Sequence, residues 1–195
     1  MVRLTGGVWR GRKLEVPEGI RPTTELARKA VFDILGDTIR GARVLDACAG
    51  SGAYGLEALS RGAAHATFVE SGRKVANSLR GNVAALGAGT RARVEEMSVA
   101  RFSSKGQEGR TAVRGGVVPA ASHAVAPPDA SFDVILHDPP FKEDSESDLQ
   151  LLLSLVGPGG WLFHERGDDE VYRPSGLEPA DRRRYGTTRL LIFRP

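Results

Sequence analysis

Cysteine is nearly absent from this sequence of 195 residues, where Cys48 is the only one. A single cysteine excludes an intramolecular disulfide framework and cysteine-rich zinc sites, and it is typical of proteins in a reducing cytoplasm. The four histidines show no metal-ligand spacing along the chain. We therefore expect chemistry that needs no metal.

Long apolar runs are also missing. No stretch approaches the roughly 20 apolar residues that cross a bilayer, and residues 1–7 lack the apolar segment of a secretory signal. With 41% hydrophobic and 26% charged residues, the chain has enough apolar side chains for a real core. We expect a cytoplasmic protein without membrane contact, most simply a monomer of one domain.

Charge of either sign is not in large excess, because the net charge is only +3. Its distribution is more informative. Residues 1–30 carry seven basic side chains against three acidic ones, and Arg182-Arg183-Arg184 forms a second basic cluster. Clustered basic charge favours binding to a phosphate backbone, although a solvated surface explains any single arginine about equally well.

The first part of the chain reads as an arm followed by a helix. Residues 1–21 are rich in Gly, Arg and Val, which predicts a basic hairpin or arm. Residues 22–195 are expected to form the main domain. Thr23 or Thr24 is a suitable N-cap for a helix over 24–35, which Gly36 ends. The apolar residues of this helix recur at helical spacing, namely Leu26, Ala30, Val31, Ile34 and Leu35.

From residue 42 onward, strands and helices alternate. Seven strands are expected at 42–46, 66–70, 91–95, 132–137, 161–165, 180–185 and 188–193. Helices are expected at 53–61, at 72–86, as a short turn at 97–103, and along an apolar face from Leu149 to Val156. This order predicts an α/β fold: a Rossmann-like, mostly parallel seven-stranded sheet with an antiparallel C-terminal hairpin. Residues 104–130 lack any periodicity and read as a flexible insertion.

A glycine-rich turn follows the first strand of this sheet. It begins with Asp46 and contains Gly50-Ser51-Gly52-Ala53-Tyr54-Gly55. Glu70 ends the next strand, 20 residues after Gly50, where a carboxylate can accept both hydroxyls of a ribose. In parallel sheets, ligands bind beyond the carboxyl ends of the strands, so this turn is expected to bind a nucleotide-like cofactor.

Two cofactors fit this turn. The glycines satisfy the dinucleotide fingerprint G-x-G-x-x-G, so an NAD-dependent oxidoreductase is one hypothesis. Asp46 argues against it, because a carboxylate there would face the pyrophosphate unfavourably. The same carboxylate is favourable beside the cationic sulfonium and amino group of S-adenosylmethionine, which is the cofactor that we favour.

Asp138-Pro139-Pro140-Phe141 follows the strand at 132–137, where a substrate would meet the cofactor. The amino nitrogen of a base is a poor nucleophile, because its lone pair is delocalised into the ring. A carboxylate and an inward-pointing carbonyl can both accept its N–H bonds and aim the lone pair at a methyl group. The prolines restrict the backbone, and Phe141 offers a face for stacking. At an arbitrary position a plain turn would be the better interpretation.

The chain resembles the RsmD family of bacterial guanine-N2 methyltransferases of 16S ribosomal RNA. The resemblance runs nearly end to end, and its specific signals are the arm at 6–14 and the stretch at 21–28. The glycine-rich loop and Asp138-Pro139-Pro140-Phe141 contribute less, because many amino-methyltransferases have them. The final segment at 185–190 fits as well.

The resemblance implies a class I methyltransferase that acts on a guanine of 16S rRNA within the small ribosomal subunit. The catalytic residues are expected to be Asp138, Pro139, Pro140 and Phe141. The residues expected to hold S-adenosylmethionine are Asp46, Ala49, Gly50, Ser51, Gly52, Glu70, Ser98 and Asp138. The residues expected to contact nucleic acid are Arg10, Arg12, Lys13, Arg21, Thr23 and Arg28.

Two positions depart from the family pattern. The loop after the third strand, where the family has an acid or Asn toward the adenine, reads Glu95-Glu96-Met97-Ser98-Val99, so Ser98 is the candidate there. Cys48 stands where a larger residue is usual. Three alternatives remain: methylation of DNA or of adenine N6, the dehydrogenase, and a binding protein that has lost catalysis.

Overall fold

A computed structural model describes residues 2–19, 24–112, 131–140, 145–167 and 178–195. Three expected site residues, Arg21, Thr23 and Phe141, lie outside these ranges. Within them, no helix is long and apolar enough to cross a membrane.

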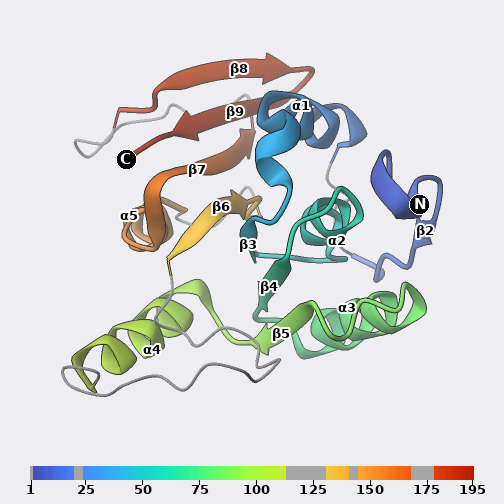
Figure 1. Ribbon diagram of the computed structural model, residues 1–195, viewed down its shortest axis with the longest axis horizontal. Coiled ribbons are helices and arrows are strands. Elements are labelled where there is room, and N and C mark those ends of the chain that lie inside the picture. Colours follow the sequence, from blue (N-terminus) through green and yellow to red (C-terminus); the bar gives the residue numbers. More distant parts are fainter. Residues whose placement is uncertain (1, 20–23, 113–130, 141–144, 168–177) are drawn as a thin grey trace.

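A seven-stranded sheet forms the centre of the molecule (Figure 1), in the order β5-β4-β3-β6-β7-β9-β8. Its strands are β3 (Arg43–Ala47), β4 (His65–Glu70), β5 (Ala92–Glu96), β6 (Phe132–His137), β7 (Val156–Gly167), β8 (Asp181–Tyr185) and β9 (Thr188–Phe193). The strands from β3 to β7 pair in parallel, and β9 pairs antiparallel with both β7 and β8. The expected mostly parallel sheet with an antiparallel C-terminal hairpin is confirmed.

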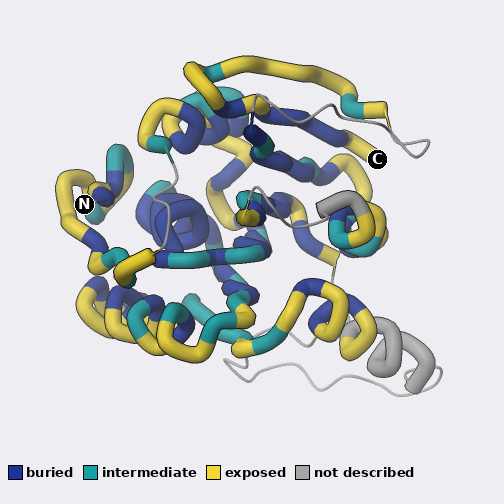
Figure 2. Tube along the Cα trace, turned by 180° about the vertical axis from the view of Figure 1, so that it is seen from behind, coloured by how far each residue is buried: buried dark blue, intermediate teal, exposed yellow. Residues whose placement is uncertain are grey.

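Helices cover both faces of this sheet. The helices are α1 (Glu25–Leu35), α2 (Ala53–Ser60), α3 (Arg73–Ala85), α4 (Val99–Ala112) and α5 (Ser145–Leu153), with a short 3-10 turn η2 (Gly36–Ile39) after α1. Apolar residues of α1, α2 and α3 form one core cluster with the sheet, and those of α4 and α5 form a second cluster. Figure 2 shows the buried residues along the inner strands and the exposed ones on the outer surfaces.

The N-terminal arm is a small hairpin. Strands β1 (Val2–Arg3) and β2 (Lys13–Leu14) pair antiparallel around the 3-10 turn η1 (Gly7–Trp9). Its apolar side chains belong to the same core cluster as α1 and α2, namely Val2, Leu4 and Leu14. The hairpin is therefore attached to the main domain through shared core contacts.

Helix α1 begins and ends where the sequence indicates. The Thr24 hydroxyl accepts a hydrogen bond from the Ala27 amide, and Gly36 ends the helix with a φ of 51°. Its buried face is Ala27, Arg28, Val31, Phe32 and Leu35. Part of the expected apolar face is therefore wrong, because Leu26 is 58% exposed.

Two further boundaries differ from the expectation. Helix α4 runs on to Ala112, so residues 104–112 are helical, and only the remainder of the expected insertion, 113–130, lies outside the described residues. Helix α5 ends at Leu153, and Val156 is the first residue of β7. Residues 104–112 lack a helical period, so the sequence did not indicate that the helix continues. Val156 continues the apolar spacing of the helix before it, so the sequence did not indicate that a strand begins there.

Candidate active site

Three acidic residues lie at the carboxyl ends of neighbouring strands. Asp46 lies near the end of β3, Glu70 ends β4, and Asp138 directly follows β6. Strand β3 lies between β4 and β6 in the sheet, and all three run in parallel. The three carboxylates therefore come together at one edge, where open α/β sheets bind their ligands.

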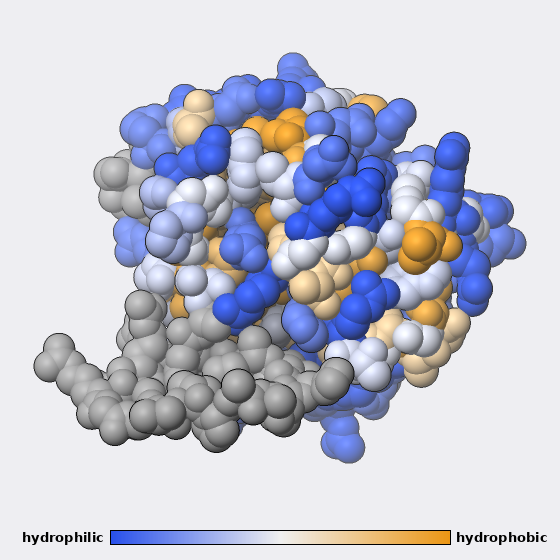
Figure 3. All heavy atoms as spheres, viewed as in Figure 1, coloured by the Kyte–Doolittle hydropathy of each residue, from blue (hydrophilic) through white to orange (hydrophobic). Residues whose placement is uncertain are grey.

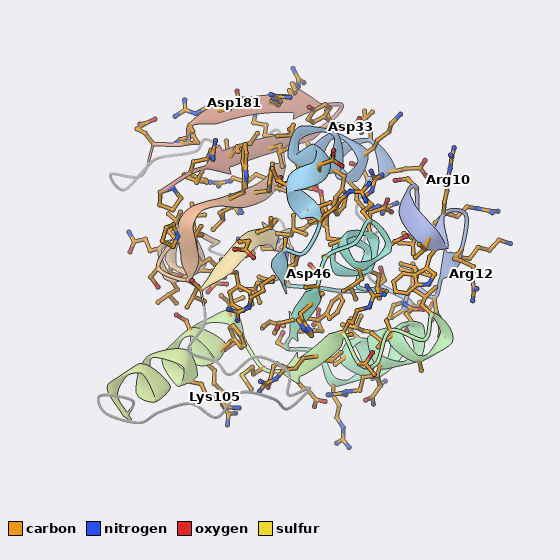
Figure 4. The ribbon with its side chains drawn as sticks, viewed as in Figure 1. Arg10, Arg12, Asp33, Asp46, Lys105 and Asp181 are labelled. Carbon is orange, nitrogen blue, oxygen red and sulfur yellow. The ribbon has the colours of Figure 1, made fainter. Side chains whose placement is uncertain are left out.

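Asp46 is the most enclosed of the three acids, and Figure 4 places it in the interior of the molecule. Its Oδ2 atom accepts a hydrogen bond from the Gly55 amide at 2.8 Å, in the first turn of α2. Burial raises the pKa of Asp46 well above its usual value, and the charges of Asp138 and Glu70 raise it further. The three acids thus share one electrostatic environment that favours a positively charged ligand.

Glu70 holds two loops in place. Its Oε2 atom accepts a hydrogen bond from the Gly50 amide at 3.0 Å, and its Oε1 atom accepts one from the Gly72 amide at 2.8 Å. Each carboxylate oxygen has a second lone pair. Glu70 can therefore fix the glycine-rich loop and still accept hydrogen bonds from ligand hydroxyls.

The glycine-rich loop needs its glycines. Gly50 and Gly52 have φ values of 54° and 79°, which only glycine adopts without strain. A Cβ atom at Gly52 would also lie 2.3 Å from the Leu79 Cδ1 atom. Ala49 and Ser51, which alternate with these glycines, are buried, so the loop presents mainly backbone to a ligand.

Asn82 of α3 fastens this loop, a role that sequence reasoning missed. Its Nδ2 atom donates to the carbonyl oxygens of Ser51, at 3.0 Å, and Glu15, at 2.9 Å. Its Oδ1 atom accepts from the Glu15 amide, also at 2.9 Å. An asparagine inside a helical pattern carries no signal that would have identified this contact in advance.

The second loop begins with Asp138, which is partly buried, and continues with the buried Pro139 and the exposed Pro140. The preceding residue, His137, is 1% exposed, and its Nδ1 atom lies 3.0 Å from Nδ1 of His164. Burial lowers the pKa of His137 to about 3 and that of His164 well below its usual value. With pKa values this low, both imidazoles are weak bases, so neither is poised to take a proton from the substrate.

Ser98 lies at the start of α4. Its side-chain oxygen accepts a hydrogen bond from the Arg101 amide at 3.3 Å, and its carbonyl accepts one from the Phe102 amide. These contacts make Ser98 a cap of the helix. Its contact with an adenine remains a prediction.

A further group of side chains meets beside the two loops. One possible ligand atom each from Cys48, His137 and Asp148 lies within 4.8 Å of the others. These residues come from three separate segments, so histidine spacing along the chain gave no sign of them. Possible metal ligands that are far apart in the sequence therefore lie close together in the folded chain.

The expected nucleic-acid contacts divide into two sets. Arg10, Arg12 and Lys13 are exposed on the hairpin, and Figure 4 shows Arg10 pointing away from the body of the molecule. The Arg12 Nη2 atom donates to the Ala85 carbonyl at the end of α3, at 3.1 Å. Arg28, in contrast, is 1% exposed. Its Nη2 atom donates to the Arg3 carbonyl at 2.6 Å, and its Nε atom lies 3.7 Å from Glu57. The expectation for Arg28 is corrected, since a buried and paired guanidinium does not reach a phosphate.

A groove of about 590 Å³ separates α1 from β8. Hydrophobic side chains are exposed there among hydrophilic ones (Figure 3). Helix α1 forms one wall with both apolar and charged residues, and β8 contributes Arg183 and Tyr185. The residues from α1 are Leu26, Lys29, Ala30, Asp33 and Ile34. Arg183 is paired with Asp181 at 2.8 Å, and Arg182 with Glu178 at 2.5 Å, so part of the positive charge of this strand is neutralised.

Comparison with known proteins gives consistent matches. Residues 2–194 match the family model described as "Conserved hypothetical protein 95". The chain is 37% identical over 166 residues to "Ribosomal RNA small subunit methyltransferase D" of Escherichia coli (strain K12), covering 84% of this chain and 71% of that protein. The protein of the same name from Haemophilus influenzae is 34% identical over 83% of this chain and 73% of its own length. A solved structure of a hypothetical protein from Thermus thermophilus superposes with a TM-score of 0.80 at 33% identity, covering all of both chains.

Proposed function

The chain belongs to the family described as "Conserved hypothetical protein 95", together with the ribosomal RNA small subunit methyltransferase D proteins, and on this premise we propose its reaction. It transfers a methyl group from S-adenosylmethionine to the exocyclic N2 amino group of a guanine in 16S rRNA. Its substrate is the RNA within an assembled or assembling small ribosomal subunit. It acts in the cytoplasm as a monomer.

The convergence of Asp46, Glu70 and Asp138 at one sheet edge carries this proposal. Three carboxyl groups gathered at one edge suit a ligand that is itself cationic, because a nearby positive charge favours their ionised form, and they do not suit a pyrophosphate. This favours S-adenosylmethionine over a dinucleotide, although the loop also satisfies the dinucleotide fingerprint.

The residues present fit S-adenosylmethionine. Glu70 is available to accept hydrogen bonds from the ribose hydroxyls. The backbone of the Ala49–Gly52 loop is available to the methionine portion, and Asp46 lies beneath that loop. Bound S-adenosylmethionine supplies an electrophilic methyl group on a sulfonium. Ser98 and the start of α4 lie after β5, next to β4 in the sheet, and are the candidates for contacting the adenine.

Asp138 and the backbone of Pro139 orient the acceptor. The Asp138 carboxylate accepts one N–H bond of the amino group, and a carbonyl of the proline segment accepts the other. The nitrogen lone pair is thereby directed at the methyl group, and Phe141 stacks against the base. Positioning of this kind raises the rate of transfer by several orders of magnitude, because the two reactants are held in line instead of meeting by chance.

The exposed basic side chains of the hairpin, Arg10, Arg12 and Lys13, contact the RNA backbone together with Arg21 and Thr23. Phosphate contacts of this type give affinity and orientation and carry no sequence information of their own. The choice of RNA over DNA therefore rests on the family, whose named members are ribosomal RNA methyltransferases.

Transfer of label from a radioactive donor tests this proposal. Naked 16S rRNA, small subunits that lack the modification, and duplex DNA are each incubated with the purified chain. We expect label in ribosomal RNA, recovered as N2-methylguanine. Label confined to DNA, or recovered as N6-methyladenine, would replace the proposal with the alternative amino-methyltransferase. A change in NADH fluorescence on mixing would instead support the dehydrogenase.

A further inference from the structure

We propose that Cys48, His137 and Asp148 form a binding site for a divalent transition metal ion of the Zn²⁺ class. Their candidate ligand atoms all lie within 4.8 Å of one another. The set combines a thiol, an imidazole and a carboxylate, which are the three ligand types that Zn²⁺ takes in proteins. This inference is independent of the proposed methyl transfer.

The topology brings these residues together from three segments. Cys48 follows β3, His137 is the last residue of β6, and Asp148 lies in α5. Strands β3 and β6 are neighbours, and Ala47 pairs with His137 in their register. Helix α5 packs on this face of the sheet, and Cys48 packs against the same core cluster. The group is thus defined by paired strands and a packed helix.

His137 provides the observation that points to a ligand. It is 1% exposed, and its Nε2 atom has no hydrogen-bond partner among the described residues. A buried polar atom without a partner is costly, and native proteins rarely leave one without a reason. A metal ion bound at Nε2 would supply the missing partner.

The contact between the two histidines fits this assignment. The Nδ1 atoms of His137 and His164 lie 3.0 Å apart, so one of them carries the hydrogen and the other accepts it. If His137 is the donor, its Nε2 atom has a free lone pair, as a metal ligand requires. Histidine ligands commonly donate their second nitrogen to a neighbouring acceptor, which fixes the tautomer and the ring orientation. His164 would have that role here.

The chemistry of the ligands selects the metal. A thiolate and an imidazole favour Zn²⁺ and Co²⁺ over Mg²⁺ or Ca²⁺, which prefer oxygen ligands. Ligand atoms around a tetrahedral Zn²⁺ lie about 3.3–3.8 Å apart, given bonds of about 2.0–2.3 Å. The candidate atoms of the three residues lie within 4.8 Å of one another, so a small rotation of side chains would bring them to these separations. Three protein ligands leave a fourth position for water.

The position of the site suggests its effect. Cys48 lies two residues before Gly50 of the glycine-rich loop, and His137 directly precedes Asp138. A metal bound between them would hold the two loops and α5 in one arrangement. Binding is therefore expected to stabilise the folded chain, because the unfolded chain lacks the preformed site.

Cobalt absorption tests the proposal on the full chain. The chelator-treated protein is titrated with Co²⁺, and a thiolate-to-cobalt charge-transfer band is recorded. Cys48 is the only cysteine, so no other residue of the chain can produce this band. We expect the band to saturate at one Co²⁺ per chain, to disappear when Zn²⁺ displaces Co²⁺, and to be absent in Cys48→Ser.

Two further variants refine the test. Asp148→Asn is expected to weaken Co²⁺ binding by about tenfold or more, because the carboxylate charge is lost. His65→Gln, which changes a histidine outside the group, is the matched control and should bind as the unaltered chain does. Absence of the band from the unaltered chain overturns the proposal, whether or not the variants fold. Equal affinity of Asp148→Asn and the unaltered chain overturns the three-ligand site.

Discussion

Asn82 donates a hydrogen bond from its side-chain amide to the carbonyl oxygen of Ser51, across 3.0 Å. The same amide donates to and accepts from the backbone of Glu15. One buried side chain of α3 therefore joins the end of the N-terminal arm to the glycine-rich loop. This contact couples the segment proposed to meet RNA with the loop proposed to hold the methyl donor.

Asn82→Ala removes these three hydrogen bonds and leaves backbone groups buried without partners. We expect a loss of about 1–3 kcal/mol in the free energy of unfolding, measured by urea denaturation. Binding of S-adenosylhomocysteine, followed by titration calorimetry, should weaken as well, because the loop is less well fixed. Asn77→Ala, on the exposed side of the same helix, is the control and should change neither quantity appreciably. Equal behaviour of the two variants would contradict this role for Asn82.

Glu70→Gln tests the cofactor loop. The amide side chain keeps one acceptor oxygen and replaces the other with an N–H group that opposes an amide hydrogen of Gly50 or Gly72. We expect the affinity for S-adenosylhomocysteine to fall by at least about tenfold, which corresponds to about 1.4 kcal/mol. Glu96→Gln, at the exposed end of β5, serves as the comparison. Unchanged affinity in Glu70→Gln would exclude Glu70 from the site.

Arg28→Met tests whether this arginine stabilises the fold. Arg28 is buried against Glu57, whose oxygens also contact Arg61 and Thr5. Breaking a buried ion pair costs about 3–5 kcal/mol, and the remaining contacts of Glu57 should keep the loss at the lower end. Arg40→Met breaks an exposed pair with Asp37 and should cost less than about 1 kcal/mol. Weaker RNA binding without a loss of stability would restore the original assignment of Arg28 to the nucleic-acid interface.

The hairpin residues are tested together by replacing Arg10, Arg12 and Lys13 with glutamine. RNA affinity should fall, and the slope of log affinity against log salt should decrease by roughly 0.7–0.9 for each phosphate that the variant no longer neutralises. Filter binding at several salt concentrations measures both. Arg80→Gln, on α3, removes a cation elsewhere and should leave the slope unchanged. A slope unaffected by the triple replacement would place the RNA on another surface.

Much of the fold follows from local patterns in the sequence. The alternation of apolar strands and amphipathic helices is a property of neighbouring residues, so most elements are found close to their expected positions. The buried face of α1 is different, because Leu26, Ala30 and Ile34 form a stripe directly beside Ala27, Val31 and Leu35. Which stripe is buried depends on what packs against the helix, and the sequence of the helix alone does not contain that information.

The candidate site divides in the same way. Acids at strand ends can be placed from the sequence, because parallel strands end at a common edge. Arg28 was expected on the surface, since its partner Glu57 lies 29 positions away on another helix. The meeting of Cys48, His137 and Asp148 likewise depends on strand order. Contacts between distant segments depend on the tertiary fold, so they cannot be predicted from residue type alone.

Mass mapping of ribosomal RNA tests the central claim most directly. RNA from a strain that lacks this gene is compared with RNA from three complemented strains. These carry the unaltered chain, Asp138→Asn, or, as the control, Asp133→Asn at the exposed start of β6. We predict that one N2-methylguanine of 16S rRNA is missing from the deletion strain. The unaltered chain and Asp133→Asn should restore it, and Asp138→Asn should not. Ribosomal RNA that is unchanged by the deletion, or a missing methyl group on adenine, would contradict the claim.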